Sequence, residues 1–174
     1  MNVLEHLEPK SVFRFFEEMC AIPHGSRNTK AVSDWCADFA RARGLEYHQD
    51  GDNNIIIIKE AAPGYEAAPP VILQGHLDMV CEQTADCQKD MSREGLDLAV
   101  DGDFVYAKGT TLGGDDGIAV AMALALLDAE GLPHPRLEAV FTVDEEIGLL
   151  GAASIDVTPL KGRQMLNLDS EAEG

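Results

Sequence analysis

Apolar residues recur at helical spacing in two segments near the amino terminus. The first set is Val12, Phe15, Phe16, Met19 and Cys20, and the second is Val32, Trp35, Cys36, Phe39 and Ala40. Residues three or four positions apart lie on the same face of a helix, so each set forms one apolar stripe. Pro23 and Gly25 end the first segment, and Gly44 is placed to cap the second. The pattern predicts two amphipathic helices.

Shorter apolar runs bounded by turn residues predict strands along the rest of the chain. Residues 45–49 and 55–58 flank the turn-forming stretch 50–54, an arrangement typical of a hairpin. The four isoleucines of 55–58 indicate a strand covered on both faces. The remaining expected elements are strands at 71–73, 138–143 and 165–168, a hairpin at 98–106 and a helix at 118–129. Strands that alternate with helices predict an α/β fold, with a mixed β-sheet and helices on both of its faces.

The net charge of the chain indicates which classes of partner it can bind. It carries 31 acidic against 13 basic residues, a net charge of −18, which opposes binding to nucleic acid or to anionic membranes. No apolar stretch approaches the roughly 20 residues of a membrane span, and the first ten residues lack the apolar core of a signal peptide. We therefore expect a cytoplasmic protein for which cations are more natural partners than nucleic acid or membranes.

The four cysteines, Cys20, Cys36, Cys81 and Cys87, lack the spacing of a zinc finger. Cys20 and Cys36 fall on the apolar faces of the two expected helices, and we interpret all four as reduced thiols. A Cys81–Cys87 disulfide would require an oxidising compartment.

The most informative chemistry lies just after the expected strand 71–73. His76 and Asp78 are two residues apart, so they point the same way in an extended backbone. Asp78 can then hold the ring of His76 and fix its tautomer, as carboxylates do for metal-bound imidazoles. The other histidines have no partner at recognisable ligand spacing, and we interpret them as surface or capping residues: His6, His24, His48 and His134.

Three acidic clusters follow, each at the edge of an apolar run. They are Asp115-Asp116 in the glycine-rich turn 113–117, Asp144-Glu145-Glu146, and Asp169-Ser170-Glu171. With His76 they indicate one two-metal hydrolase site, because such a site needs several nitrogen or oxygen ligands and one group shared between the ions.

Each acidic cluster has a second interpretation. Asp115 is the candidate for the carboxylate that two ions share, and the alternative is that it caps the following helix. If Asp115 binds metal, Asp116 would either cap the helix or support a metal ligand without binding the metal itself. In the run 144–146 one glutamate can bind metal while the other acts as general base, because adjacent side chains diverge. A solvated loop is the alternative for that run.

Taken together, these motifs resemble the di-zinc peptidase superfamily of aminoacylases, carboxypeptidases and dipeptidases, most closely its cytosol non-specific dipeptidase branch. The similarity runs through residues 21–24, 74–80, 100–103, 108–118, 142–146 and 166–171. The Gly-Thr-Thr-Leu-Gly block at 109–113 is specific to that branch. The resemblance implies a zinc-exopeptidase-like catalytic domain.

The resemblance also implies a role for each candidate residue. It assigns zinc binding to His76, Asp115, Glu146 and Asp169, with Asp115 shared by two ions. Asp78 would orient His76, and Glu145 would act as general base. Manganese and cobalt are the expected substitutes for zinc.

One ligand of the family pattern has no counterpart in this sequence. It is a histidine near the carboxyl terminus of chains more than twice as long, and those chains also carry a lid domain. We therefore expect residues 1–174 to be the amino-terminal portion of the catalytic domain, without the lid or dimerisation domain and the carboxyl-terminal catalytic segment. Alone, this portion should be inactive and bind at most one zinc ion tightly.

The expected function of the whole protein is metal-dependent hydrolysis of dipeptides, of the Xaa-His type and broader. A sibling N-acyl-amino-acid deacylase or tripeptidase is the nearest alternative. A non-catalytic domain that binds metal or another subunit is the alternative from a different class. We expect a small peptide substrate and no nucleic-acid or membrane partner. A homodimer is compatible with the sequence.

Overall fold

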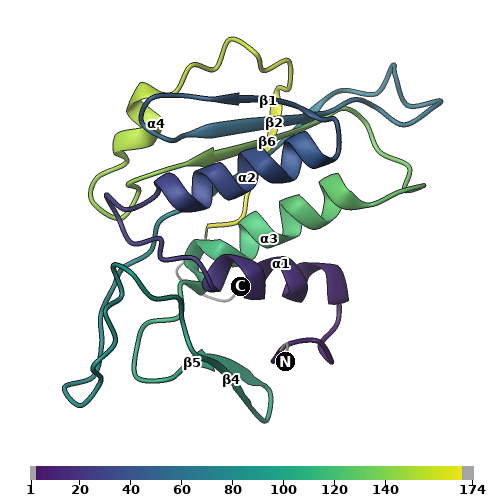
Figure 1. Ribbon diagram of the computed structural model, residues 1–174. Coiled ribbons are helices and arrows are strands. Elements are labelled where there is room, and N and C mark those ends of the chain that lie inside the picture. Colours follow the sequence, from purple (N-terminus) through teal and green to yellow (C-terminus); the bar gives the residue numbers. More distant parts are fainter. Residues whose placement is uncertain (1–2, 170–174) are drawn as a thin grey trace.

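The computed structural model describes residues 3–169, which fold around one mixed β-sheet (Figure 1). The helices are α1 (Lys10–Cys20), α2 (Lys30–Ala42), α3 (Gly114–Asp128) and α4 (Leu150–Ser154). The strands are β1 (Glu46–Gln49), β2 (Ile55–Lys59), β3 (Val71–His76), β4 (Leu98–Asp101), β5 (Phe104–Ala107), β6 (Leu137–Thr142) and β7 (Gln164–Asn167). Every element expected from the hydrophobic pattern is present, and within residues 3–169 the one further element is α4.

The main sheet of the described chain has five strands in the order β1-β2-β6-β3-β7. β1, β2 and β6 pair antiparallel, whereas β6, β3 and β7 run parallel. Every residue of the central strand β6 is buried. His76 lies opposite Thr142 in the register of β3 with β6, so these two strands end level with each other.

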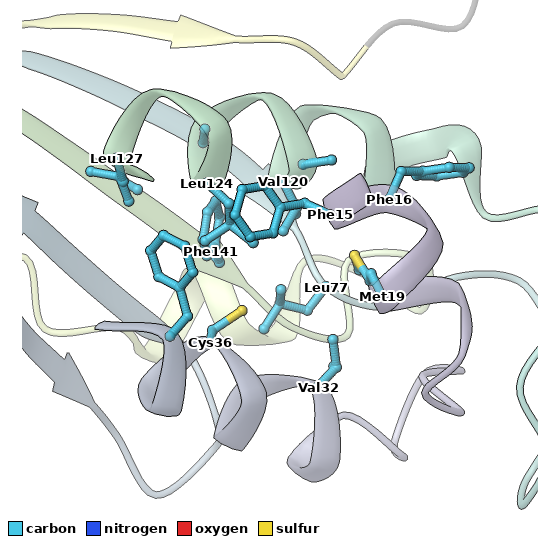
Figure 2. Close-up of a cluster of buried hydrophobic side chains, with 14 of the residues drawn as sticks. Phe15, Phe16, Met19, Val32, Cys36, Leu77, Val120, Leu124, Leu127 and Phe141 are labelled. Atoms are coloured by element: carbon cyan, nitrogen blue, oxygen red, sulfur yellow. The ribbon is translucent and has the colours of Figure 1, made fainter. Parts of the chain in front are cut away.

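Three helices cover one face of the sheet. α2 lies against β1 and β2, α3 lies against β3 and β6, and α1 packs on α3 (Figure 1). The core between them includes Phe15, Val32, Leu77, Leu124 and Phe141 (Figure 2). The two predicted apolar stripes therefore face a common core, and burial of such side chains is the main force that holds helices on a sheet.

On the opposite face, the segment that follows α4 packs against the sheet. There Ile56, Ile58 and Val140 form a second, smaller apolar cluster, against which Ile155 and Leu160 pack. Ile55 and Ile57 belong instead to the core on the helix side. Alternate isoleucines of β2 thus enter different clusters, and the prediction of a strand covered on both faces is confirmed.

The structure corrects one interpretation of single residues and confirms another. His24 and His134 are buried, so a surface position is wrong for both, and each Nδ1 atom lies within 2.7 Å of a main-chain carbonyl oxygen. All four cysteines are free thiols, as expected. Burial, with a smaller contribution from Glu17, raises the pKa of Cys20 to about 12, so this thiol stays neutral.

Between residues 3 and 169, none of the helices has the length and apolar character needed to cross a membrane.

β4 and β5 form a separate two-stranded hairpin that projects from the helix side of the molecule (Figure 1).

Candidate metal centre

The candidate site residues gather where the parallel strands end. His76 is the last residue of β3, the run 144–146 follows β6, and Asp169 follows β7. Because these three strands are parallel and adjacent, their carboxyl ends share one edge of the sheet. The amino-terminal end of α3 brings Asp115 to the same edge. Ligands of open α/β sheets commonly bind at this edge.

Three side chains converge closely enough to hold one ion. His76, Asp115 and Glu146 each offer a ligand atom, and these atoms all lie within 4.8 Å of one another. The Nε2 atom of His76 is 3.1 Å from Oδ1 of Asp115 and 3.9 Å from an oxygen of Glu145. His76 is buried, whereas the carboxylate of Asp115 is half exposed. The site therefore has a buried side, formed by His76, and a side at Asp115 that a ligand can reach from solvent.

The orientation of the His76 ring leaves Nε2 for the site. Nδ1 lies 2.9 Å from the main-chain oxygen of Asp78 and 3.5 Å from its carboxylate. Without a metal ion, a doubly protonated ring can donate from Nδ1 to Asp78 and from Nε2 to Asp115. In a metal-bound ring the proton would stay on Nδ1, and the lone pair of Nε2 would be the ligand. The sequence predicted that Asp78 orients His76, and in the structure the nearer acceptor is the main-chain oxygen of Asp78 rather than its side chain.

The buried carboxylate of Asp78 joins the histidine to the acidic turn after β6. It accepts hydrogen bonds from the hydroxyl of Ser26 at 2.8 Å and from the main-chain N–H groups of Glu145 at 3.0 Å and Glu146 at 3.3 Å. Burial alone would raise the pKa of Asp78, but these hydrogen bonds and the contact with His76 lower it. Asp78 is therefore held as an anion that positions both sides of the site.

The three acids of the run 144–146 have different surroundings. Asp144 adopts a left-handed backbone conformation and accepts a hydrogen bond of 2.6 Å from the main-chain N–H of Arg27, so it braces the loop after α1. Glu146 belongs to the group of three ligands, and Glu145 faces His76. The run is therefore more than a solvated loop, because each of its members contacts or faces another part of the site.

The structure also separates the roles of Asp115 and Asp116. Gly113 precedes α3 in a left-handed conformation and makes no side-chain cap hydrogen bond, and Asp115 and Asp116 have non-helical backbone angles before the regular part of the helix. Asp116 is buried and accepts a hydrogen bond of 3.2 Å from the main-chain N–H of His76. Its close approach requires the glycine at position 75, since a Cβ there would lie 2.7 Å from the Asp116 carboxylate. The peptide bond between the two aspartates is cis.

Asp169 lies outside the group of three candidate ligands, and its charge acts on the neighbouring Asp116. Burial raises the pKa of Asp116 to about 7, with the charges of Asp169 and Asp115 acting in the same direction against that of His76. The other members of its cluster, residues 170 and 171, lie outside the described residues.

The electrostatics of the site fit a divalent cation. Burial lowers the pKa of His76, but the hydrogen bond and charge of Asp78, the charge of Asp116 and the hydrogen bond with Asp115 outweigh it and raise the pKa to about 9. Burial raises the pKa of Glu146, and neighbouring carboxylates add to that rise. Carboxylate and imidazole groups crowded around one point are the donor set that zinc and similar ions take, and a cation would relieve their mutual repulsion.

Sequence reasoning missed the loop between α1 and α2. Ser26 and the main-chain N–H of Arg27 support Asp78 and Asp144, and Gly25 forms an isolated bridge with Met79. No spacing or motif marks these residues, because their partners are distant along the chain.

The fold and this cluster define an α/β protein with candidate metal ligands at the carboxyl edge of its sheet. Residues 72–165, more than half of the chain, match the family described as Peptidase family M20/M25/M40. The chain therefore belongs to this peptidase family, and the resemblance drawn from the motifs is confirmed. Members of this family generally depend on metal ions.

Two relatives match nearly the whole chain. It is 37% identical over 174 residues to the cytosol non-specific dipeptidase of Escherichia coli (strain K12), covering 100% of this chain and 36% of that protein. The crystal structure of aminoacylhistidine dipeptidase from Vibrio alginolyticus matches with a TM-score of 0.94 and 38% identity, over 98% of this chain and 35% of that one. The chain thus spans about a third of the length of these relatives.

A more distant structure shares the fold. A tripeptidase from Staphylococcus aureus subsp. aureus mu50 matches with a TM-score of 0.77 and 22% identity, over 94% of this chain and 44% of that one.

Proposed function

We propose that this chain is the amino-terminal portion of the catalytic domain of a metal-dependent dipeptidase that hydrolyses Xaa-His and other dipeptides. The convergence of His76, Asp115 and Glu146 beside Glu145 carries the proposal. The similarity to the dipeptidases from E. coli and V. alginolyticus supports the substrate class. The name of the E. coli relative also supports a cytoplasmic location.

The metal we propose is zinc, with two ions in the complete protein and manganese or cobalt as substitutes. His76, Asp115, Glu146 and Asp169 would hold them, with Asp115 shared, because a carboxylate has two oxygens that can bridge two ions. When bound, such ions lower the pKa of water to about 7 and polarise the scissile carbonyl group.

The protein groups around the ions would perform the remaining steps. Glu145 is placed to take the proton from the attacking water, since it faces the same point as His76 Nε2 without belonging to the group of three ligands. Asp78 keeps His76 and the 145–146 turn in register through its hydrogen bonds. The half-exposed side of the site leaves room for a peptide.

Two alternative functions would give different experimental results. A sibling N-acyl-amino-acid deacylase or tripeptidase would use the same metal chemistry on another substrate. A metal-binding or subunit-interaction domain without activity would show metal binding and no turnover.

The test uses the complete natural polypeptide that contains these residues, stripped of metal and reloaded with zinc. It is assayed on Xaa-His dipeptides, a tripeptide and N-acetyl amino acids. Zinc-dependent turnover concentrated on dipeptides is the expected result. Turnover confined to N-acetyl amino acids or tripeptides would assign a sibling activity, and zinc binding without any turnover would overturn the enzymatic proposal.

A further inference from the structure

The position of Glu145, the proposed general base, depends on its main chain and its neighbours. Its carboxylate lies 3.9 Å from Nε2 of His76, and among residues 3–169 it forms no closer ion pair. Its main-chain N–H donates to Oδ1 of Asp78 at 3.0 Å. A general base must lie within about 2.6–3.2 Å of the group whose proton it takes, so a small shift of this main chain changes what the carboxylate can reach.

Asp144, the residue before Glu145, is joined to Arg27 in the loop between α1 and α2. The main-chain N–H of Arg27 donates to Oδ1 of Asp144 at 2.6 Å. Both residues have a left-handed backbone, with φ of 65° for Arg27 and 54° for Asp144. Residues other than glycine seldom adopt this conformation, and the surrounding contacts must maintain it where they do. The hydrogen bond therefore holds the backbone that leads into Glu145.

Ser26, one residue earlier in the same loop, contacts the carboxylate that accepts the N–H of Glu145. Its hydroxyl donates to Oδ2 of Asp78 at 2.8 Å. Oδ1 of the same carboxylate accepts from Glu145 and lies 3.5 Å from Nδ1 of His76. A hydrogen bond on Oδ2 hinders rotation of the carboxylate, so it keeps Oδ1 directed at Glu145 and His76.

The loop itself is anchored to the rest of the fold. The N–H of Asn28 donates to the carbonyl oxygen of Gly25 at 2.8 Å, which closes the turn that contains both donors. Gly25 forms an isolated bridge with Met79, and the N–H of Met79 donates to the carbonyl oxygen of His24 at 3.2 Å. These contacts fix the loop to the segment that carries Asp78, so the loop can hold the acidic turn after β6 in place.

We propose that the loop between α1 and α2 positions Glu145 for proton transfer, and that Ser26 and Asp144 are positioning residues of the reaction. Ser26 acts through Asp78, and Asp144 joins Arg27 to the base. The inference rests on the proposed dipeptidase function, in which Glu145 takes the proton of water. A displacement of about 1 Å can cost about 10²-fold in rate, so loss of either contact should lower kcat rather than raise KM.

The experiment measures kcat, KM and zinc content of the complete protein at saturating zinc, with Ala-His as substrate. Asp144→Gly and Asp144→Asn form a matched pair, because glycine and asparagine both accept a left-handed backbone and only asparagine keeps an acceptor oxygen. We expect Asp144→Gly to lower kcat by about 10- to 100-fold, with KM within about 2-fold of the unmodified value and zinc content unchanged. Asp144→Asn should retain most of the activity.

Ser26→Ala tests the second contact and covers the case in which Asp144→Gly does not fold. It removes the donor to Asp78 and should lower kcat by about 10-fold or more. Ser26→Thr keeps a hydroxyl group and should retain most of the activity. Thr158→Val is the control, because the hydroxyl of Thr158 donates to the exposed carboxylate of Asp156 outside the site. It should leave kcat unchanged.

The same substitution in a Glu145→Gln background separates positioning of the base from a general effect on structure. Without the base, Asp144→Gly should cause no further loss of the residual activity, whereas a merely structural role would lower that activity again.

Three results would overturn the proposal. They are a further loss in the Glu145→Gln background equal to that in the unmodified protein, an equal loss within either matched pair, and unchanged kcat in folded Asp144→Gly and Ser26→Ala. Failure of the unmodified protein to cleave any dipeptide would overturn the proposed function instead, so the two failures are distinguishable.

Discussion

At the scale of single residues, Asp78 is the side chain on which the geometry of the site depends most. Its carboxylate receives three hydrogen bonds, from Ser26 and from the main chain of Glu145 and Glu146, and its main-chain oxygen holds the ring of His76. A group that contacts both sides of a metal centre controls ligand positions without binding the metal itself.

Asp78→Asn tests this role. The amide keeps the size of the side chain but loses the charge and one acceptor oxygen. Since Oδ1 accepts from Glu145 and Oδ2 accepts from Ser26 and Glu146, at least one of the three donors loses its partner. We expect zinc affinity or kcat/KM of the complete protein to fall by roughly 10- to 100-fold. Isothermal titration of the metal-stripped protein and steady-state kinetics measure the two quantities. Asp103→Asn, in the exposed turn between β4 and β5, is the control. Equal behaviour of the two variants would remove Asp78 from the site.

Glu145 and its neighbour Glu146 differ in a way that substitution can separate. Glu145→Gln should lower turnover by about 10² to 10⁴-fold and leave the zinc content unchanged, because an amide cannot accept the proton of water. Glu146→Gln should lower the zinc content together with activity, since Glu146 is one of the three candidate ligands. Elemental analysis beside kinetics distinguishes these outcomes. Loss of zinc in Glu145→Gln would make Glu145 a ligand, and full activity would exclude it as the base.

At the scale of elements, a buried ion pair connects the central strand to the segment before β7. Glu138 of β6 is fully buried and accepts hydrogen bonds from Nε of Arg136 at 2.7 Å and from the main-chain N–H groups of Lys161 and Gly162 at 2.9 Å. This segment leads directly into β7, after which Asp169 follows. The pair therefore helps to place the last strand of the described sheet.

Glu138→Gln should lower the free energy of unfolding by about 3 kcal/mol at pH 7, because it removes the buried carboxylate beside the Arg136 cation and leaves that cation only the exposed Glu60 as a charged partner. Burial raises the pKa of Glu138, but Arg136 and the two N–H groups outweigh it and lower the pKa below its usual value. A lowered pKa means that the stabilisation is complete above the pKa of the unfolded chain, about 4.3, and is lost as pH falls through the folded value.

The difference between unmodified protein and Glu138→Gln should therefore shrink at acidic pH, as urea titrations at pH 7 and below pH 4 would measure. Glu60→Gln is the matched control. Glu60 contacts the same arginine from an exposed position, so its loss should cost less than about 1 kcal/mol. A constant difference at all pH values, or equal effects of the two variants, would contradict this account of the pair.

At the scale of the whole molecule, the described ligands complete fewer metal sites than a two-metal mechanism needs. In the assignment that the resemblance implies, His76, Asp115 and Asp169 would hold one ion, and Asp115 and Glu146 would leave a second ion one protein ligand short. The structure instead brings His76, Asp115 and Glu146 together around one point, which also amounts to one three-ligand set. We predict that residues 1–174 alone bind at most one zinc ion tightly and show no significant dipeptidase activity. Calorimetric titration of the metal-stripped segment, followed by a dipeptide assay at saturating zinc, tests this. Two tight sites with robust turnover would show that another residue or a second copy supplies the remaining ligand.

The exposed edge strand β7 is a candidate surface for self-association of the chain. β7 lies at one edge of the described sheet, and Met165, Leu166 and Leu168 are 60%, 55% and 46% exposed. An apolar edge strand with unpaired main-chain groups is a site where further strands can add. A homodimer stays a prediction, and light scattering at several protein concentrations would measure it.

Local sequence determined most of the secondary structure. The stripes of α1 and α2 and the alternate burial of the four isoleucines in β2 follow from helix and strand periodicity. α3 is assigned from Gly114, whereas the sequence predicted a helix from residue 118; the regular part of α3 begins only after Asp116, close to the predicted start. Its first residues, Asp115 and Asp116, have non-helical backbone angles in a glycine-rich segment without periodic apolar residues. α4 was missed because Gly151 is its one buried residue, so it has no apolar stripe.

The sequence by itself also determined which residue types the site contains, because His76 and the acidic clusters each stand at the edge of an apolar run. Only the tertiary structure decided how they act on one another. The hydroxyl of Ser26 reaches Asp78 across 52 positions of the chain, and the N–H of Glu145 does so across 67. The parallel alignment of β3 with β6 and the close approach of Gly75 to Asp116 bring these groups together. Residue spacing encodes contacts within one element, whereas contacts between distant loops arise only when the sheet closes around a common core.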